Sequence, residues 1–296
     1  MWEFAAELPA NVAGVIGFGA GLSNPGDGFT RAFGGGRSFA FVGGAGDADF
    51  NYVETRAFAA QLRLRKLSAR FVEYRGTHEW PPAAICGAAL EWMHARAMLA
   101  GRIPLDSSFV VGRITAELDS ARSLEQRGQR AAAAIGFGTV SDDYAGWPGA
   151  SEANRRREAL TSERAVREFL ARSDALAQAD QRHATELERE LLLARGRSAS
   201  VEQLVERLRV AELQRQSATG DSLAAPAARR LLARVHVALA FYEPRAYLAK
   251  GAARQALLML AAASRITPLV GESCTLLARA RALAPKIHPE LRCVSS

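Results

Sequence analysis

The first third of the chain alternates short apolar runs with longer segments of helical periodicity. Three runs rich in β-branched and aromatic residues, at 10–18, 38–44 and 69–76, are typical of buried strands that end beside glycine. Segment 53–67 has apolar residues at helical spacing, and segment 85–101 is a helical run that ends at a glycine. The order strand, loop, strand, helix, strand, helix predicts an α/β segment with a parallel sheet and crossover helices.

The remaining two thirds of the chain carry almost no strand pattern. Turn residues divide this part into helical candidates at 108–134, 152–195, 200–217, 223–248, 252–265 and 270–283. Segment 241–268 resembles tetratricopeptide units in its small-residue and aromatic spacing, although a generic helical bundle explains it nearly as well. We therefore predict two domains: the C-terminal strands of an α/β sheet at 1–104, and an all-α helical-hairpin domain at 105–296.

Composition and charge exclude several classes of function. The net charge is +7, but in the C-terminal part arginines alternate with acids, as at 157–169, and do not form the basic cluster that nucleic-acid binding requires. The chain has no run of about 18 apolar residues, so we expect no membrane-spanning helix. The N-terminal residues lack the basic and apolar regions of a signal peptide. We expect neither nucleic-acid binding nor export, and localisation stays open with the cytoplasm as the default.

The cysteines predict no special chemistry. Cys86, Cys274 and Cys293 make an odd number without a C-x-x-C pair, so we expect neither a disulfide framework nor a zinc site. No Walker loop is present. A dinucleotide fold is also disfavoured, because Leu22 follows Gly17 and Gly19 where a third glycine is needed. We therefore expect no metal and no cofactor.

Polar residues with catalytic potential follow two of the predicted strands. Asp47 and Asp49 come after the second strand, and His78 comes after the third, with about one helix between them. An α/β-hydrolase sheet supplies the acid and then the base of a Ser-His-Asp triad in this order. The acid would accept the imidazole Nδ1–H and fix the tautomer, so that Nε2 can take the serine proton.

Two loop motifs carry a resemblance to a known family. The tetrapeptide Asp-Phe-Asn-Tyr at 49–52 is similar to the acid loop of esterases, and GTHEWPP at 76–82 is similar to their catalytic histidine loop. Residues 10–104 resemble bacterial α/β-hydrolases of the dienelactone hydrolase, phospholipase/carboxylesterase and polyhydroxybutyrate-depolymerase-like type. Several such proteins carry a helical C-terminal region. The resemblance implies that His78 is the base and Asp49 the acid; Asp47 is the alternative acid.

The chain departs from this family in lacking a nucleophile. It contains no G-x-S-x-G, and the residues before the first strand resemble the last turns of a nucleophile helix. Ser23 precedes Asn-Pro in an expected loop and Ser38 opens an expected strand, so neither lies on a strand-to-helix elbow. We expect the nucleophile and about half of the sheet to lie outside a truncated chain, which by itself would be inactive.

Three interpretations of function follow from these observations. The first is a serine-hydrolase module of the carboxylesterase or dienelactone hydrolase type, which acts on a small ester or acyl substrate once the nucleophile is supplied. The second is a non-catalytic helical-repeat protein that binds a protein partner on its helical domain and retains a degenerate hydrolase remnant. The third is an incomplete gene product with an exposed sheet edge and poor solubility.

Overall fold

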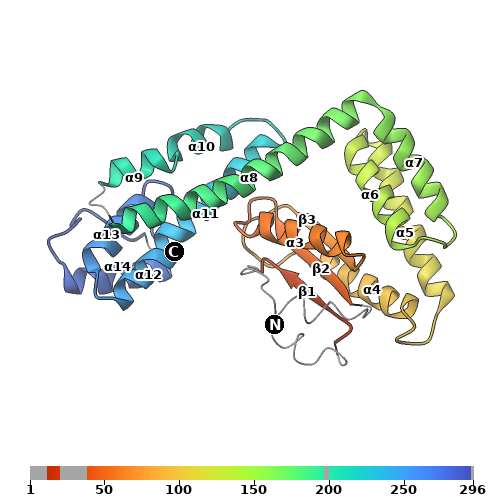
Figure 1. The fold of residues 1–296 in the computed structure, drawn as a ribbon, viewed down its shortest axis with the longest axis horizontal. Helices are drawn as coiled ribbons and strands as arrows, with labels where there is room; N and C mark the ends of the chain where they lie inside the picture. Colours follow the sequence, from red (N-terminus) through yellow and green to blue (C-terminus); the bar gives the residue numbers. More distant parts are fainter. Residues whose placement is uncertain (1–11, 21–38, 197–199, 295–296) are drawn as a thin grey trace. The chain divides into compact units, whose positions relative to one another are not determined.

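The structure is a computed structural model that describes residues 12–20, 39–196 and 200–294 (Figure 1). Contacts within the chain group it into two compact units. The sheet unit comprises the described residues up to Ala45, Glu54–Tyr74 and Trp80–Ala175. The helical unit comprises Gly46–Val53, Arg75–Glu79 and the described residues from Leu176 onward. The domain boundary expected after residue 104 stays a prediction, since a contact unit need not fold independently.

Three parallel strands form a small sheet in the order β1-β2-β3. Their bounds are β1 Gly14–Phe18, β2 Ala40–Gly46 and β3 Ser68–Tyr74. β1 pairs with β2 in the register Gly14 to Ala40, and β2 is buried along its whole length. A central strand buried on both faces needs a continuous apolar run, which is the pattern that the sequence has here.

Helices cover both faces of the sheet. The Phe41 ring of β2 meets the Phe58 ring edge-on at 5.0 Å, in a core with α3 (Tyr52–Leu64). The next residue, Val42, belongs to a second core with Trp92 of α4 (Ala83–Leu99). Successive side chains of a strand point to opposite faces, so α3 and α4 lie on opposite sides of β2. These elements match the predicted α/β segment in order and type.

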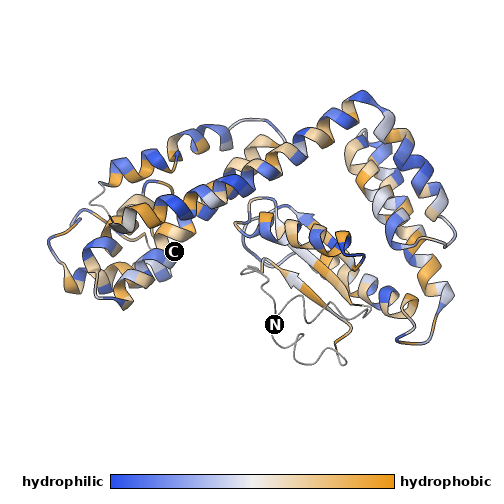
Figure 2. Ribbon diagram, viewed as in Figure 1, coloured by the Kyte–Doolittle hydropathy of each residue, from blue (hydrophilic) through white to orange (hydrophobic). Residues whose placement is uncertain are grey.

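Three further helices and the start of a fourth complete the sheet unit. They are α5 Ser107–Gln126, α6 Arg130–Asp143, α7 Ala150–Ser162 and α8 Arg164–Gly196, the last of which continues into the helical unit. α7 is hydrophilic along most of its length (Figure 2), and three of its residues are buried: Ala150, Ala153 and Leu160.

The break between α5 and α6 differs from the sequence prediction. We expected one helix over 108–134 and a break at the GFGT segment, but the chain turns at Gly128, whose φ is +76°. Gly136 instead lies inside α6, where an added Cβ would come within 3.2 Å of the Cβ of Ala121. Gly136 therefore allows α5 and α6 to pack closely and does not end a helix.

A largely buried charge cluster joins β3 to the helices of the sheet unit. Arg70 Nη2 lies 2.7 Å from Glu117 Oε2, and Arg70 also pairs with Asp143. Trp92 Nε1 donates to Asp143 Oδ2 at 3.1 Å. Because buried charges need partners and hydrogen bonds, this cluster fixes α4, α5 and α6 against the strand.

The helical unit is built mainly from short helices around a large apolar core. Their bounds are α9 Val201–Arg207, α10 Val210–Ser217, α11 Ala224–Val237, the π-helical turn η1 Ala238–Tyr242, α12 Glu243–Ala249, α13 Ala253–Ala263 and α14 Glu272–Leu283. A smaller apolar cluster lies between α10 and α11. Ser200 and Gln203 form a reciprocal capping box at α9, which confirms the helix start predicted there. The tetratricopeptide resemblance stays a prediction.

The cysteines correct one expectation from the sequence. Cys274 and Cys293, which are 19 residues apart, form a disulfide in the helical unit, whereas Cys86 is free. Odd cysteine counts exclude complete pairing but not a single bridge, and only the fold brings these two side chains together. No helix in the described parts of the chain is long and apolar enough to cross a bilayer.

Candidate active site

The first element of the candidate site is the acid loop, defined as Gly46–Val53, which comprises the end of β2, the turn after it and the first residues of α3. Asp49 N donates to Gly46 O at 3.0 Å, which closes a turn, and Tyr52 N donates to Asp49 O at 3.1 Å as α3 begins. The Asp49 carboxylate accepts from Asn51 N at 2.8 Å. Asp49 is 0% exposed. A buried carboxylate needs hydrogen-bond donors, and the loop backbone supplies at least one of them.

The second element is the histidine loop, Arg75–Glu79, which follows β3. His78 Nδ1 lies 3.2 Å from Asp49 Oδ1 and 3.3 Å from Oδ2, and the imidazole is about half exposed. The Phe50 ring lies against the imidazole, with 4.4 Å between ring centroids and a tilt of 33°. Hydrogen bonding and stacking therefore hold the ring from two sides.

Asp47 has a different position from Asp49. Its Oδ1 accepts from Gly76 N at 3.0 Å, and Ala48 N donates to Gly76 O at 2.9 Å, so the two loops are joined by a pair of bonds. The structure thus brings His78 together with Asp49, whereas the Asp47 side chain binds the backbone of the histidine loop.

Close approach of the loops requires glycine at one position in each. A Cβ added at Gly46 would lie 2.4 Å from Gly76 O and 2.5 Å from Thr77 O, which is closer than real Cβ contacts. Gly76 has a φ of +149°, which side-chain-bearing residues rarely adopt. Gly46 at the end of β2 and Gly76, two residues before His78, therefore allow the geometry that brings Asp49 and His78 together.

This arrangement has the chemistry of an acid-base pair. If the imidazole proton is on Nδ1, it is donated to Asp49 and the lone pair on Nε2 can accept a proton. The buried carboxylate would then stabilise the imidazolium that forms. Half-exposure of the ring leaves room for a reacting group, in contrast to the complete burial of the acid.

Two arginines of α11 contact the acid loop, and the sequence analysis missed them. Arg230 Nη1 donates to Asp47 O at 3.0 Å, and Arg234 Nη2 donates to Phe50 O at 2.6 Å. All of these residues belong to the helical unit. The only signal in the sequence is the spacing of two arginines by one helical turn, which the arginine-rich background conceals.

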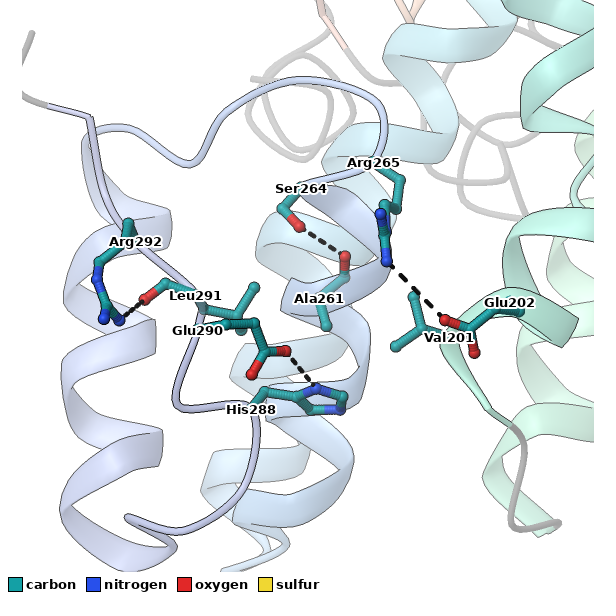
Figure 3. A pocket seen from close by; sticks show the side chains of 9 residues that line it. All are labelled: Val201, Glu202, Ala261, Ser264, Arg265, His288, Glu290, Leu291 and Arg292. Atoms are coloured by element: carbon teal, nitrogen blue, oxygen red, sulfur yellow. Dashed lines mark hydrogen bonds and ion pairs between the residues drawn. The ribbon is translucent and has the colours of Figure 1, made fainter.

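The remaining histidines lie elsewhere. His94 is exposed on α4, whereas His183 on α8 and His236 on α11 are partly buried, which lowers the pKa of both imidazoles. His288 Nδ1 lies 3.0 Å from Glu290 Oε1, in a hollow of about 300 Å³ between α9, α13 and the C-terminal segment (Figure 3). That hollow is lined by neither loop of the candidate site.

Ser23 and Ser38, which the sequence disfavours as nucleophiles, lie outside the described residues. Within the described residues, no group of three or more His, Cys, Asp or Glu side chains could hold a metal ion. No protein-family model, curated protein or solved structure matches the chain. The geometry of the two loops is therefore the basis for any assignment of function.

Proposed function

We propose that this chain supplies the acid and the base of a Ser-His-Asp triad in a serine hydrolase similar to carboxylesterases and dienelactone hydrolases. The observation that carries the proposal is the buried Asp49 carboxylate at 3.2 Å from His78 Nδ1, with the imidazole half exposed. Both residues follow parallel strands at the carboxyl edge of the sheet, where open α/β folds bind their ligands.

In the proposed mechanism His78 moves a proton twice. Its Nε2 takes the proton of a serine hydroxyl while the serine oxygen attacks the carbonyl carbon of an ester. The imidazolium then gives that proton to the leaving alcohol, and an acyl-enzyme remains. Water then attacks the acyl-enzyme while His78 takes a proton from it, and the imidazolium returns a proton to the serine oxygen. The carboxylic acid product is released and the serine is restored. Asp49 keeps the imidazole oriented and stabilises its positive charge throughout.

The nucleophile and the oxyanion donors are the parts that this chain would receive from elsewhere. No G-x-S-x-G occurs in its 296 residues. We propose that a polypeptide segment encoded upstream in the same frame supplies them. The substrate class is an ester or a related acyl compound, which is what the acid-base chemistry accommodates.

Two measurements in sequence test this proposal. The first reads the DNA upstream of codon 1, where an open frame encoding strands and a G-x-S-x-G is expected. The second treats the continuous product with a fluorophosphonate probe, which labels activated serine. Labelling of the upstream serine should be lost in His78→Ala, because an unactivated hydroxyl is a weak nucleophile.

His94→Ala is the matched control, because His94 is an exposed histidine on α4. It should label like the unsubstituted protein. Labelling that persists unchanged in His78→Ala would overturn the proposal. An in-frame stop codon directly upstream would rule out supply of the nucleophile by the same polypeptide. It would favour the interpretation of the chain as a non-catalytic protein that binds a partner through its helices.

The interaction alternative stays a prediction. It treats the N-terminal part as a remnant and the helices as an independent binding module. The contacts of α11 with the acid loop favour the hydrolase proposal instead, because they place the helices and the candidate site in one compact unit.

A further inference from the structure

We propose that Arg230 and Arg234 of α11 are positioning residues, which hold the acid loop so that Asp49 and Phe50 orient His78. The inference rests on the proposed function and deepens it. It assigns the helical region a role in the acid-base site, in place of a separate binding role. Every residue in the argument belongs to the helical unit.

Arg230 fixes the start of the acid loop. Its Nη1 donates to Asp47 O at 3.0 Å, and its guanidinium carbon lies 4.1 Å from the centroid of the Tyr52 ring. These two contacts lie on either side of Asp49 in the chain. A planar guanidinium that both donates a hydrogen bond and stacks on an aromatic ring fixes direction as well as distance.

Asp180 of α8 fixes Arg230 in turn. Its Oδ2 accepts from Arg230 Nη2 at 2.8 Å and from Nε at 3.3 Å. Asp180 is 1% exposed and Arg230 is 8% exposed. Burying such a pair costs desolvation energy that an apolar pair would avoid, so stability alone is a weak explanation for it. The remaining guanidinium nitrogen, Nη1, donates to the acid loop, so the buried pair fixes the position of this donor.

Arg234 acts one helical turn later on the residue that stacks on the base. Its Nη2 donates to Phe50 O at 2.6 Å, and the Phe50 ring lies against His78. The backbone of the acid loop is thus held at Asp47 and at Phe50, on both sides of the catalytic carboxylate. Displacement at either point would move Asp49 relative to His78 Nδ1.

The test records ¹⁵N shifts of the His78 ring and amide hydrogen exchange at Asn51 in this chain. The unsubstituted protein should show a protonated Nδ1 and an unprotonated Nε2. In Arg230→Met the ring should shift toward the tautomer mixture of free histidine. Exchange at Asn51 N, which donates to Asp49 Oδ1, should accelerate on the order of tenfold, as expected for loss of one hydrogen bond.

Two further variants keep the test decisive. Arg230→Met leaves Asp180 buried without its partner and can unfold the unit, so the double variant Arg230→Met/Asp180→Leu removes both charges together. Arg234→Met should give the same ring signature independently. Arg229→Met is the control, because Arg229 is an exposed neighbour on α11 that donates to Ser217 O, away from the loop.

The outcomes separate this inference from the proposed function. An unsubstituted protein whose His78 lacks the Nδ1–H form contradicts the proposed function itself. An Nδ1–H form that persists in the folded double variant and in Arg234→Met, with unchanged exchange at Asn51, overturns the positioning role alone. Loss of the form in both, with Arg229→Met unchanged, supports the inference.

Discussion

At the scale of single residues, two aspartates two positions apart have different partners. The Asp49 carboxylate forms a hydrogen bond with His78 Nδ1, and the Asp47 carboxylate accepts one from the backbone of the histidine loop. Strand alternation cannot distinguish them, since residues i and i+2 of an extended segment face the same side. The turn closed between Asp49 N and Gly46 O separates their directions.

This difference predicts unequal effects of equal substitutions. Asp49→Asn presents an amide to the imidazole and favours the wrong tautomer, so probe labelling of the continuous hydrolase should fall on the order of 10³- to 10⁴-fold. Asp47→Asn keeps an oxygen that can accept from Gly76 N, so labelling should change by less than about tenfold. Rates of fluorophosphonate labelling measure both. Equal losses in the two variants would contradict the assignment of Asp49 as the acid.

At the scale of elements, two partly buried histidines on the helices predict that stability depends on pH. His183 on α8 and His236 on α11 each have an Nδ1 without a hydrogen-bond partner within the described residues. Burial lowers the pKa of both below the ordinary value of 6.5. The unfolded chain therefore binds more protons than the folded chain below about pH 6.5.

The sign of this effect gives a prediction for stability. The free energy of unfolding should be highest above about pH 6.5 and fall as pH decreases through the lowered pKa values of the folded state. His236→Gln removes one of the two groups and should flatten this dependence between pH 7.5 and about 5. Urea unfolding at several pH values measures it. His94→Gln, an exposed control on α4, should leave the slope unchanged; a flat dependence in the unsubstituted protein would contradict the prediction.

Helix breaks show the limit of local signals at this scale. Gly128 lies within the helix expected over 108–134 and Gly136 lies in the expected break, yet the first has a positive φ between α5 and α6 and the second lies inside α6. Only the neighbouring helix distinguishes them, because the absence of a Cβ at Gly136 makes room for Ala121. The capping box at Ser200 was predictable because both of its partners lie within one turn of sequence.

At the scale of the whole molecule, the compact units do not follow chain order. The helical unit includes the acid loop and the histidine loop, which come from the segment that carries the strands. Such a division reflects proximity between segments far apart in the chain, which the hydrogen bond of Arg230 with Asp47 O, more than 180 residues apart, accompanies. No local pattern reports contacts of this kind.

The disulfide predicts different stability in the two units on reduction. The Cys274–Cys293 bridge closes a 19-residue separation, for which loop entropy gives about 3 kcal/mol. Reduction should therefore lower the urea midpoint seen by far-UV circular dichroism. Tryptophan fluorescence should shift less, because the three tryptophans among the described residues, Trp80, Trp92 and Trp147, lie in the sheet unit; Trp2 lies outside the described residues. Cys274→Ser/Cys293→Ser should not respond to reductant. Equal shifts in both signals would show that the units unfold together.

The sequence by itself determined the strands, the helical C-terminal region and the placement of Asp49 and His78 after successive strands. Each of these depends on periodicity or on nearest neighbours, which local composition encodes. Tertiary structure decided which aspartate meets the imidazole, which two cysteines pair and which arginines hold the loop. Those outcomes depend on directions and distances between segments far apart in the chain, where one residue type has many equivalent positions and packing selects one.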